Sequence, residues 1–152
     1  MPLAPPAARP AGGPVAPDPQ VVLTTFAMTP EVDPHHLFVY GTLRPGEVRW
    51  QHLAPFVVGD GVDTAVAGDV YDTGLEYPAA RFGGDGRILG CVYELTRVPH
   101  ALAHLDAVEG AVRGLYRRVT VQTESGHHAW AYECGDDTLL VRHLVHGDWA
   151  RR

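Results

Sequence analysis

The sequence contains no lysine, since all twelve of its basic residues are arginine. Catalysis that uses a lysine amine, such as Schiff-base formation, is therefore excluded. Basic residues are also few beside the eighteen acidic ones, so the net charge is −6, and no basic run appears. Proteins that bind nucleic acid usually present a basic patch, so this balance argues against a nucleic-acid partner.

Cysteine is scarce as well. Cys91 and Cys134 are far apart, and each lies in a strand-like apolar segment. We expect two free, buried thiols in a reducing compartment, and therefore a cytoplasmic protein. No apolar run approaches the ~18 residues that a membrane-spanning helix needs, so no membrane partner is expected. A Gly-x-Ser-x-Gly motif is also absent, which leaves no sign of a serine nucleophile.

Proline, in contrast, is concentrated at one end of the chain. Nine of the 13 prolines lie in residues 1–34, together with many alanines. A segment of this kind lacks the periodic apolar residues that would offset the entropy cost of ordering it. The sequence therefore predicts a disordered tail over residues 1–34 and one domain over residues 35–149.

The domain is predicted to consist mostly of strands. These are expected at 37–40, 56–71 (one bent strand or two short ones), 77–82, 88–95, 116–121 and 129–134. A helical turn is expected at 47–53, and hairpin connections at 83–86 and 126–128. The main helix is predicted over residues 97–109, with Thr96 as its N-cap and Gly110 as its stop. This order of elements fits an α+β domain built on a small, closed or nearly closed mixed β-barrel with one main helix.

The first predicted strand is followed directly by glycine. Its four apolar residues, Leu37 to Tyr40, indicate a strand buried on both faces. Where it stops, backbone N–H groups lose their sheet partners, and a concave set of such donors can bind a carboxylate or an oxyanion. A plain turn is the alternative. A phosphate-binding P-loop is excluded, because Glu47 and Val48 stand where lysine and serine or threonine would be required.

The main helix carries a carboxylate on its apolar side. Val98, Leu102 and Leu105 share one sector of the helix, and Glu109 falls in the middle of it. Burial and the negative end of the helix dipole both raise the pKa of a carboxyl group, which suits a general acid or base. Alternatively, the helix frays and Glu109 turns to solvent. Asp106 lies beside this sector, where we expect a structural role such as a bond to a loop N–H.

Two histidines on the same helix have the spacing of a metal-binding pair. His100 and His104 stand at positions i and i+4, but on the face opposite Glu109. A site composed of both histidines and Glu109 is therefore geometrically disfavoured. We expect the two histidines to face solvent, and no metal site is predicted.

Two of these segments together resemble a known family. Phe38-Val39-Tyr40-Gly41-Thr42-Leu43, followed by Pro45-Gly46, resembles the signature loop of the gamma-glutamylcyclotransferase-like family. Residues 104–110, followed by Tyr116-Arg117-Arg118, are similar to the segment that bears the family's catalytic glutamate. The closing Gly147-Asp148-Trp149 recurs in many bacterial members. The resemblance covers about residues 37–149, and the Tyr-Gly-Thr-Leu loop is closer to the gamma-glutamylamine type.

The resemblance implies an activity and a set of site residues. The enzyme would convert a small-molecule gamma-glutamyl amine or amide into 5-oxoproline and a free amine, without cofactor or metal. Glu109 would be the general base and acid. Substrate binding would fall to Tyr40, Gly41, Thr42, Leu43 and Tyr116. The tyrosines, Tyr132 among them, could equally be core aromatics.

Two other classes of function stay open from the sequence. One is a non-catalytic barrel that uses the same pocket to bind a small molecule. The other is gamma-glutamyl acyl transfer or amide hydrolysis in a biosynthetic pathway, which differs only in the group that attacks the carbonyl. The sequence names neither the amine nor the oligomeric state.

Overall fold

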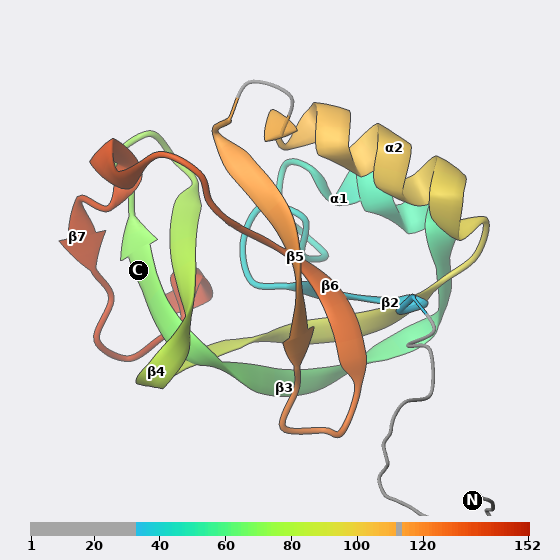
Figure 1. Cartoon of the computed structure of the whole chain (residues 1–152), viewed down its shortest axis with the longest axis horizontal. Coiled ribbons are helices and arrows are strands. Elements are labelled where there is room, and N and C mark those ends of the chain that lie inside the picture. Colours follow the sequence, from blue (N-terminus) through green and yellow to red (C-terminus); the bar gives the residue numbers. More distant parts are fainter. Residues whose placement is uncertain (1–32, 112–113) are drawn as a thin grey trace, which may run out of the picture. The chain divides into compact units, whose positions relative to one another are not determined.

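The computed structural model describes residues 33–111 and 114–152 (Figure 1). The predicted disordered tail, residues 1–34, lies outside this range apart from its last two residues. That prediction stays untested.

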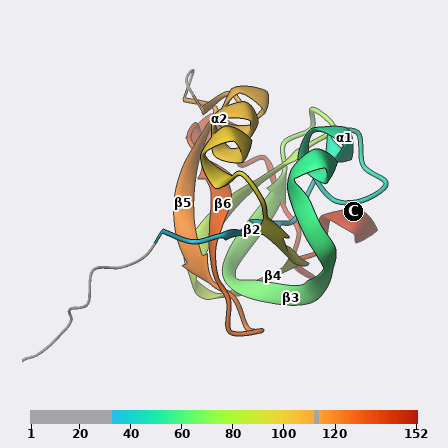
Figure 2. The same cartoon turned by 90° about the vertical axis from the view of Figure 1, so that its right-hand side faces the viewer.

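One six-stranded sheet forms the framework of the domain. Its strand order is β5-β6-β2-β4-β3-β7, and all neighbours are antiparallel except β2 and β6, which are parallel. The sheet curves into a half barrel with β5 and β7 at its edges, as Figures 1 and 2 show. This confirms the predicted α+β class and the mixed, nearly closed sheet. The strands are β2 (His36–Val39), β3 (Val57–Asp72), β4 (Pro78–Leu95), β5 (Tyr116–Gln122), β6 (His128–Cys134) and β7 (Arg142–His143).

Strands β3 and β4 are long and pair with each other along most of their length. The predicted hairpin at 83–86 is wrong, because both segments that it was expected to join belong to β4 and pair with β3. The register passes from Ala67 opposite Arg87 to Gly68 opposite Phe82, so residues 83–86 bulge outward. Gly83 has a φ of 99° and so adopts the left-handed backbone that this excursion needs. The bulge therefore bends β4 without ending the strand.

Two helices cover one face of the sheet (Figures 1 and 2). They are α1 (Trp50–Leu53) and α2 (Val98–Val108), and short 3₁₀ turns follow at η2 (Ala54–Phe56), η4 (Asp137–Leu139) and η5 (Trp149–Arg151). The helical turn predicted at 47–53 thus becomes an α-helix only at its end.

Helix α2 begins one residue later than predicted. The N-cap is Arg97, whose φ of 49° is left-handed, so Thr96 as N-cap is wrong. The helical hydrogen bonds begin with Ala101 N–H donating to Arg97 O at 2.9 Å, which leaves Thr96 outside the first turn. At the other end the predicted stop is confirmed. Glu109 is the C-cap, and Gly110, with a φ of 71°, donates its N–H to Ala107 O.

Strand β2 is buried on both faces, as predicted. Leu37 and Val39 belong to the core cluster between the sheet and the helices. Phe38 and Tyr40 belong to a second cluster on the opposite face of the sheet. Alternation of side chains therefore supplies both cores from a single short strand.

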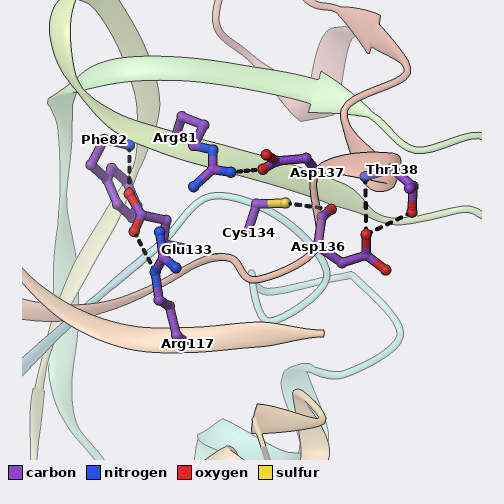
Figure 3. Close-up of polar contacts among 8 residues, drawn as sticks. All are labelled: Arg81, Phe82, Arg117, Glu133, Cys134, Asp136, Asp137 and Thr138. Atoms are coloured by element: carbon purple, nitrogen blue, oxygen red, sulfur yellow. Dashed lines mark hydrogen bonds and ion pairs between the residues drawn. The ribbon is translucent and has the colours of Figure 1, made fainter. Parts of the chain in front are cut away.

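Beyond the end of β2, its neighbours are held together by side chains. Glu133 on β6 accepts a hydrogen bond from Phe82 N–H of β4 at 3.1 Å and another from Arg117 Nε of β5 at 2.9 Å (Figure 3). Arg81 on β4 forms an ion pair with Asp137 (Figure 3). These contacts join three strands where β2 no longer supplies backbone partners.

Both cysteines are free, as predicted, and Cys134 is buried, but Cys91 is only partly buried, so the prediction of two buried thiols is wrong for Cys91. Cys91 Sγ lies 3.0 Å from Asp63 Oδ1, and Cys134 donates to the carbonyl of Asp136 at 2.9 Å (Figure 3). Within residues 33–111 and 114–152, none of the helices has the length and apolar character that crossing a membrane requires.

The C-terminal segment packs against the sheet. Trp149 is 1% exposed and lies in the second core cluster. Gly147 accepts a hydrogen bond from Leu89 N–H at 2.8 Å and has a φ of 72°. A Cβ at Gly147 would lie 1.9 Å from the carbonyl oxygen of Arg87, so only glycine fits this close approach.

Replacing Gly147 tests this approach. Gly126 is the matched control, because its φ is also positive, at 90°, while a Cβ there meets nothing within 4 Å. Gly126→Ala should cost about 1 kcal/mol of unfolding free energy, for backbone conformation alone. Gly147→Ala should cost at least about 2 kcal/mol, because the clash is added. Urea unfolding measures both, and equal losses would contradict the proposed clash.

Candidate active site

A hollow of about 330 Å³, counting its open mouth, lies where β2 ends. The six site residues predicted from the sequence all line it: Tyr40, Gly41, Thr42, Leu43, Glu109 and Tyr116. The other lining residues are Phe38, Val39, Pro78 and Tyr132. Residues from four strands, one loop and one helix end thus converge on a single pocket.

The loop after β2 is shaped by backbone hydrogen bonds. Arg44 N–H donates to Gly41 O at 3.0 Å, and Arg49 N–H donates to Thr42 O at 2.8 Å. Gly41 lies against Pro78, since a Cβ on Gly41 would come within 2.4 Å of the proline ring. The close approach of the loop to the start of β4 therefore depends on glycine.

Three backbone N–H groups of this loop are available to bind a ligand. We call residues Gly41, Thr42 and Leu43 the donor loop. Among the described residues, none of their three backbone N–H groups donates a turn hydrogen bond or a hydrogen bond to a side chain. All three residues are buried and line the pocket. Buried backbone donors need partners, so the donor loop can bind a carboxylate or a developing oxyanion.

Glu109 enters the pocket from the end of α2. Its N–H still donates to Leu105 O at 2.9 Å, so the last helical turn fixes its position. The residue is 8% exposed, which supports the buried placement and rules out the solvent-facing alternative. Glu109 Oε2 lies 3.2 Å from Arg49 Nη1.

Two opposing effects act on the charge of Glu109. Burial raises the pKa of this carboxyl above its ordinary value, and the charge and hydrogen bond of Arg49 lower it in part. The net direction is upward. A carboxyl group of this kind can exchange a proton closer to neutral pH than an exposed glutamate can.

The three pocket tyrosines are neutral donors. Tyr40 donates to Tyr132 O at 2.5 Å, Tyr116 donates to the carbonyl of Pro78, and Tyr132 donates to Asp106 Oδ1 at 2.7 Å. Burial raises the pKa of all three phenols well above the ordinary value. Their rings shape the pocket, and their hydroxyl groups brace its walls.

Asp106 has a structural position, but its partners differ from the expected loop N–H. It accepts two hydrogen bonds from Arg118, at 2.9 and 3.3 Å, and one from the Tyr132 hydroxyl. Asp106 is not among the residues that line the pocket. It joins α2 to β5 and β6 and holds one pocket wall in place.

The helix histidines lie outside the pocket. His100 and His104 are exposed, as predicted, and His104 Nε2 lies 3.2 Å from His52 Nδ1. Across the part of the chain that the structure describes, no three histidine, cysteine or acidic side chains are placed to hold one metal ion.

Sequence reasoning did not identify Arg49 and Pro78. Arg49 reaches Glu109 across 60 positions of sequence, and no local pattern marks such a pair. Pro78 did mark the start of a strand, but its contact with Gly41 arises only from the tertiary fold.

Comparison with protein families gives a match over most of the chain. The family described as "Gamma-glutamyl cyclotransferase, AIG2-like" matches residues 37–151. A Vibrio cholerae protein named "Putative gamma-glutamylcyclotransferase" is 36% identical over 118 residues, covering 78% of this chain and 97% of the relative. The "Gamma-L-glutamyl-butirosin B gamma-glutamyl cyclotransferase" of Niallia circulans is 31% identical over 122 residues, covering 75% of this chain and 74% of the relative.

Solved structures share the fold. An uncharacterized protein from Pyrococcus horikoshii has a TM-score of 0.62 at 24% identity, covering 76% of this chain and 90% of its own. An AIG2-like protein from Mus musculus has a TM-score of 0.59 at 20% identity, covering 76% and 88%. The family match and the two sequence relatives carry the assignment: this chain belongs to the gamma-glutamyl cyclotransferase, AIG2-like family.

Proposed function

We propose that the protein converts a gamma-glutamyl amine or amide into 5-oxoproline and a free amine, with Glu109 as general base and acid. Family membership and the relatives' names support gamma-glutamylcyclotransferase activity. The observation that carries the mechanism is the meeting of a buried carboxylate and the donor loop in one pocket.

The substrate supplies its own nucleophile. The α-amino group of a gamma-glutamyl amide can reach the γ-carbonyl carbon by closing a five-membered ring. Such intramolecular attack has a high effective molarity, so holding the chain curled lowers the barrier. The pocket rings of Tyr40, Tyr116 and Tyr132 provide the walls for this curled conformation.

One carboxylate can serve as both the proton acceptor and the proton donor in this reaction. Glu109 takes a proton from the α-ammonium, and the resulting amine attacks the γ-carbonyl carbon. The tetrahedral oxyanion accepts hydrogen bonds from the donor loop. When the C–N bond to the leaving group breaks, Glu109 returns its proton to the departing nitrogen. The second proton of the attacking nitrogen ends on the released amine, which leaves as an ammonium ion.

The substrate class follows from the same chemistry. Every bond change involves the gamma-glutamyl part and the departing nitrogen, so the chemistry itself sets no requirement on the rest of the amine. The name of the Niallia circulans relative refers to a gamma-glutamyl group on butirosin, which supports a panel that includes non-peptide amines.

The first prediction concerns turnover. Glu109→Gln should lower 5-oxoproline formation about 10²- to 10⁴-fold, because the proton acceptor is lost. Asp106→Asn, on the same helix but outside the pocket lining, should stay within about tenfold of the unmodified protein, since the amide can still accept the Tyr132 hydrogen bond. Mass detection of 5-oxoproline over a panel of gamma-glutamyl amines measures both variants.

The products also separate the other functions. Release of glutamate in place of 5-oxoproline would indicate hydrolysis, and binding without any product would indicate a passive binding protein. A folded Glu109→Gln protein with full turnover would overturn the proposed mechanism.

The second prediction concerns stability and pH. Because the pKa of Glu109 is raised by burial in the folded state, its stabilising contribution is present below its unfolded pKa. This contribution is lost as pH rises through the folded pKa. Glu109→Gln should therefore gain unfolding free energy relative to the unmodified protein as pH rises from about 4 to 8. Urea unfolding at a series of pH values measures the difference, and a fall with rising pH would mean that Arg49 outweighs burial.

A further inference from the structure

Arg49 contacts both halves of the proposed catalytic apparatus. Its Nη1 lies 3.2 Å from Glu109 Oε2. Its backbone N–H donates to Thr42 O in the donor loop at 2.8 Å. One residue therefore contacts both the carboxylate and the donor loop.

The contact engages only one oxygen of Glu109. Oε2 takes the hydrogen bond from Arg49, and Oε1 takes none from the side chains of the described residues. Trp149 Nε1 is the one side-chain nitrogen or oxygen there that is both fully buried and unpaired. Because Glu109 lines the pocket, its Oε1 is placed to meet a ligand there.

This arrangement differs from the other carboxylate on α2. Arg118 holds Asp106 through two nitrogens, and the Tyr132 hydroxyl adds a third hydrogen bond. Both oxygens of Asp106 are thus engaged by charged or hydroxyl donors. Glu109 has a single contact on one side, which orients the group and leaves it able to accept a proton.

Arg49 itself stays outside the pocket lining. Its guanidinium lies 5.9 Å from the centre of the Tyr77 ring, and its side chain is 31% exposed. Tyr77 in turn neighbours the pocket residue Tyr116, with ring centroids 6.1 Å apart. Arg49 therefore contacts the pocket residue Glu109 and the Tyr77 ring without lining the pocket itself.

We propose that Arg49 is a positioning residue, which holds Glu109 Oε2 so that Oε1 faces the reacting nitrogen at a fixed distance from the donor loop. This role rests on the proposed cyclotransferase function. It assigns to Arg49 the alignment of the base with the donors, a task in which small displacements cost large factors in rate.

The charge of Arg49 gives this role a pH signature. Among the residues that the structure describes, the titratable groups around Glu109 are Arg49 from the loop before α1, Tyr40 after β2, Tyr116 on β5 and Tyr132 on β6. The tyrosines stay neutral, so Arg49 is the charged group that favours the carboxylate. Its removal raises the pKa of Glu109 further, and the acid limb of kcat/KM should move to higher pH.

The test compares four proteins: unmodified, Arg49→Gln, Arg49→Lys and Arg44→Gln. Arg44 is the matched control, because it lies in the same loop but pairs with Asp148 at 3.2 Å instead of Glu109. The pH profile of kcat/KM is measured on the most active gamma-glutamyl amine. Arg49→Gln should lower kcat about 10- to 100-fold and shift the acid limb upward. Arg49→Lys should restore the limb but only part of kcat, and Arg44→Gln should leave the limb in place.

A second measurement is independent of turnover. The carboxyl carbon of Glu109, labelled with ¹³C and assigned with Glu109→Gln, is titrated by NMR in the unmodified and Arg49→Gln proteins. A higher midpoint in Arg49→Gln supports the inference. If neither the NMR midpoint nor the acid limb of kcat/KM moves in an active Arg49→Gln enzyme, the inference about Arg49 is overturned while the proposed function stands. If the unmodified protein forms no 5-oxoproline from any substrate, the proposed function fails and the catalytic role of Arg49 fails with it.

Discussion

Strand β2 ends in the middle of the sheet while β4 and β6, on either side of it, continue past its end. A strand end inside a sheet leaves backbone donors that no neighbour can satisfy, and a space that side chains must fill or frame. Here Glu133 bridges β4, β5 and β6 across that space, and Pro78 presses against Gly41. The pocket occupies what remains. Its position is thus a consequence of the sheet's topology.

The electrostatic character of the pocket follows from how each polar group is engaged. The phenol groups of Tyr40, Tyr116 and Tyr132 all donate to oxygen acceptors and stay neutral. Glu109 is the buried charge, and burial and Arg49 act on it in opposite directions. Such a carboxyl group can exchange a proton closer to neutral pH than an exposed glutamate can, whereas Asp106 accepts three hydrogen bonds and has a structural position.

Local patterns were sufficient to predict much of this arrangement. Four apolar residues in a row predicted that β2 is buried on both faces, and the helical period placed Glu109 among Leu102 and Leu105. The resemblance linked these two segments, and the structure places both at one pocket. Each signal is encoded within a few neighbouring residues, which is why it could be detected without coordinates.

The failures have physical causes too. Glycines at 83–86 predicted a chain reversal, but the same residues suit a bulge, and only the pairing with β3 decides between them. Thr96 had the chemistry of an N-cap, yet the left-handed Arg97 takes that position. Arg49 meets Glu109, and Tyr132 meets Asp106, through distant parts of the chain. Such pairs depend on tertiary packing, so no local pattern records them.

The segment that contains Trp149 links the pocket to the interior of the protein. Trp149 shares a core cluster with Phe38 and Tyr40 of the central strand region. The preceding residue, Asp148, pairs with Arg44, which closes the turn of the donor loop by its hydrogen bond to Gly41. Loosening that core would therefore displace the loop at residues 41–43 without any change in the residues that line the pocket. The same few contacts therefore support both the second core cluster and the loop that lines the pocket.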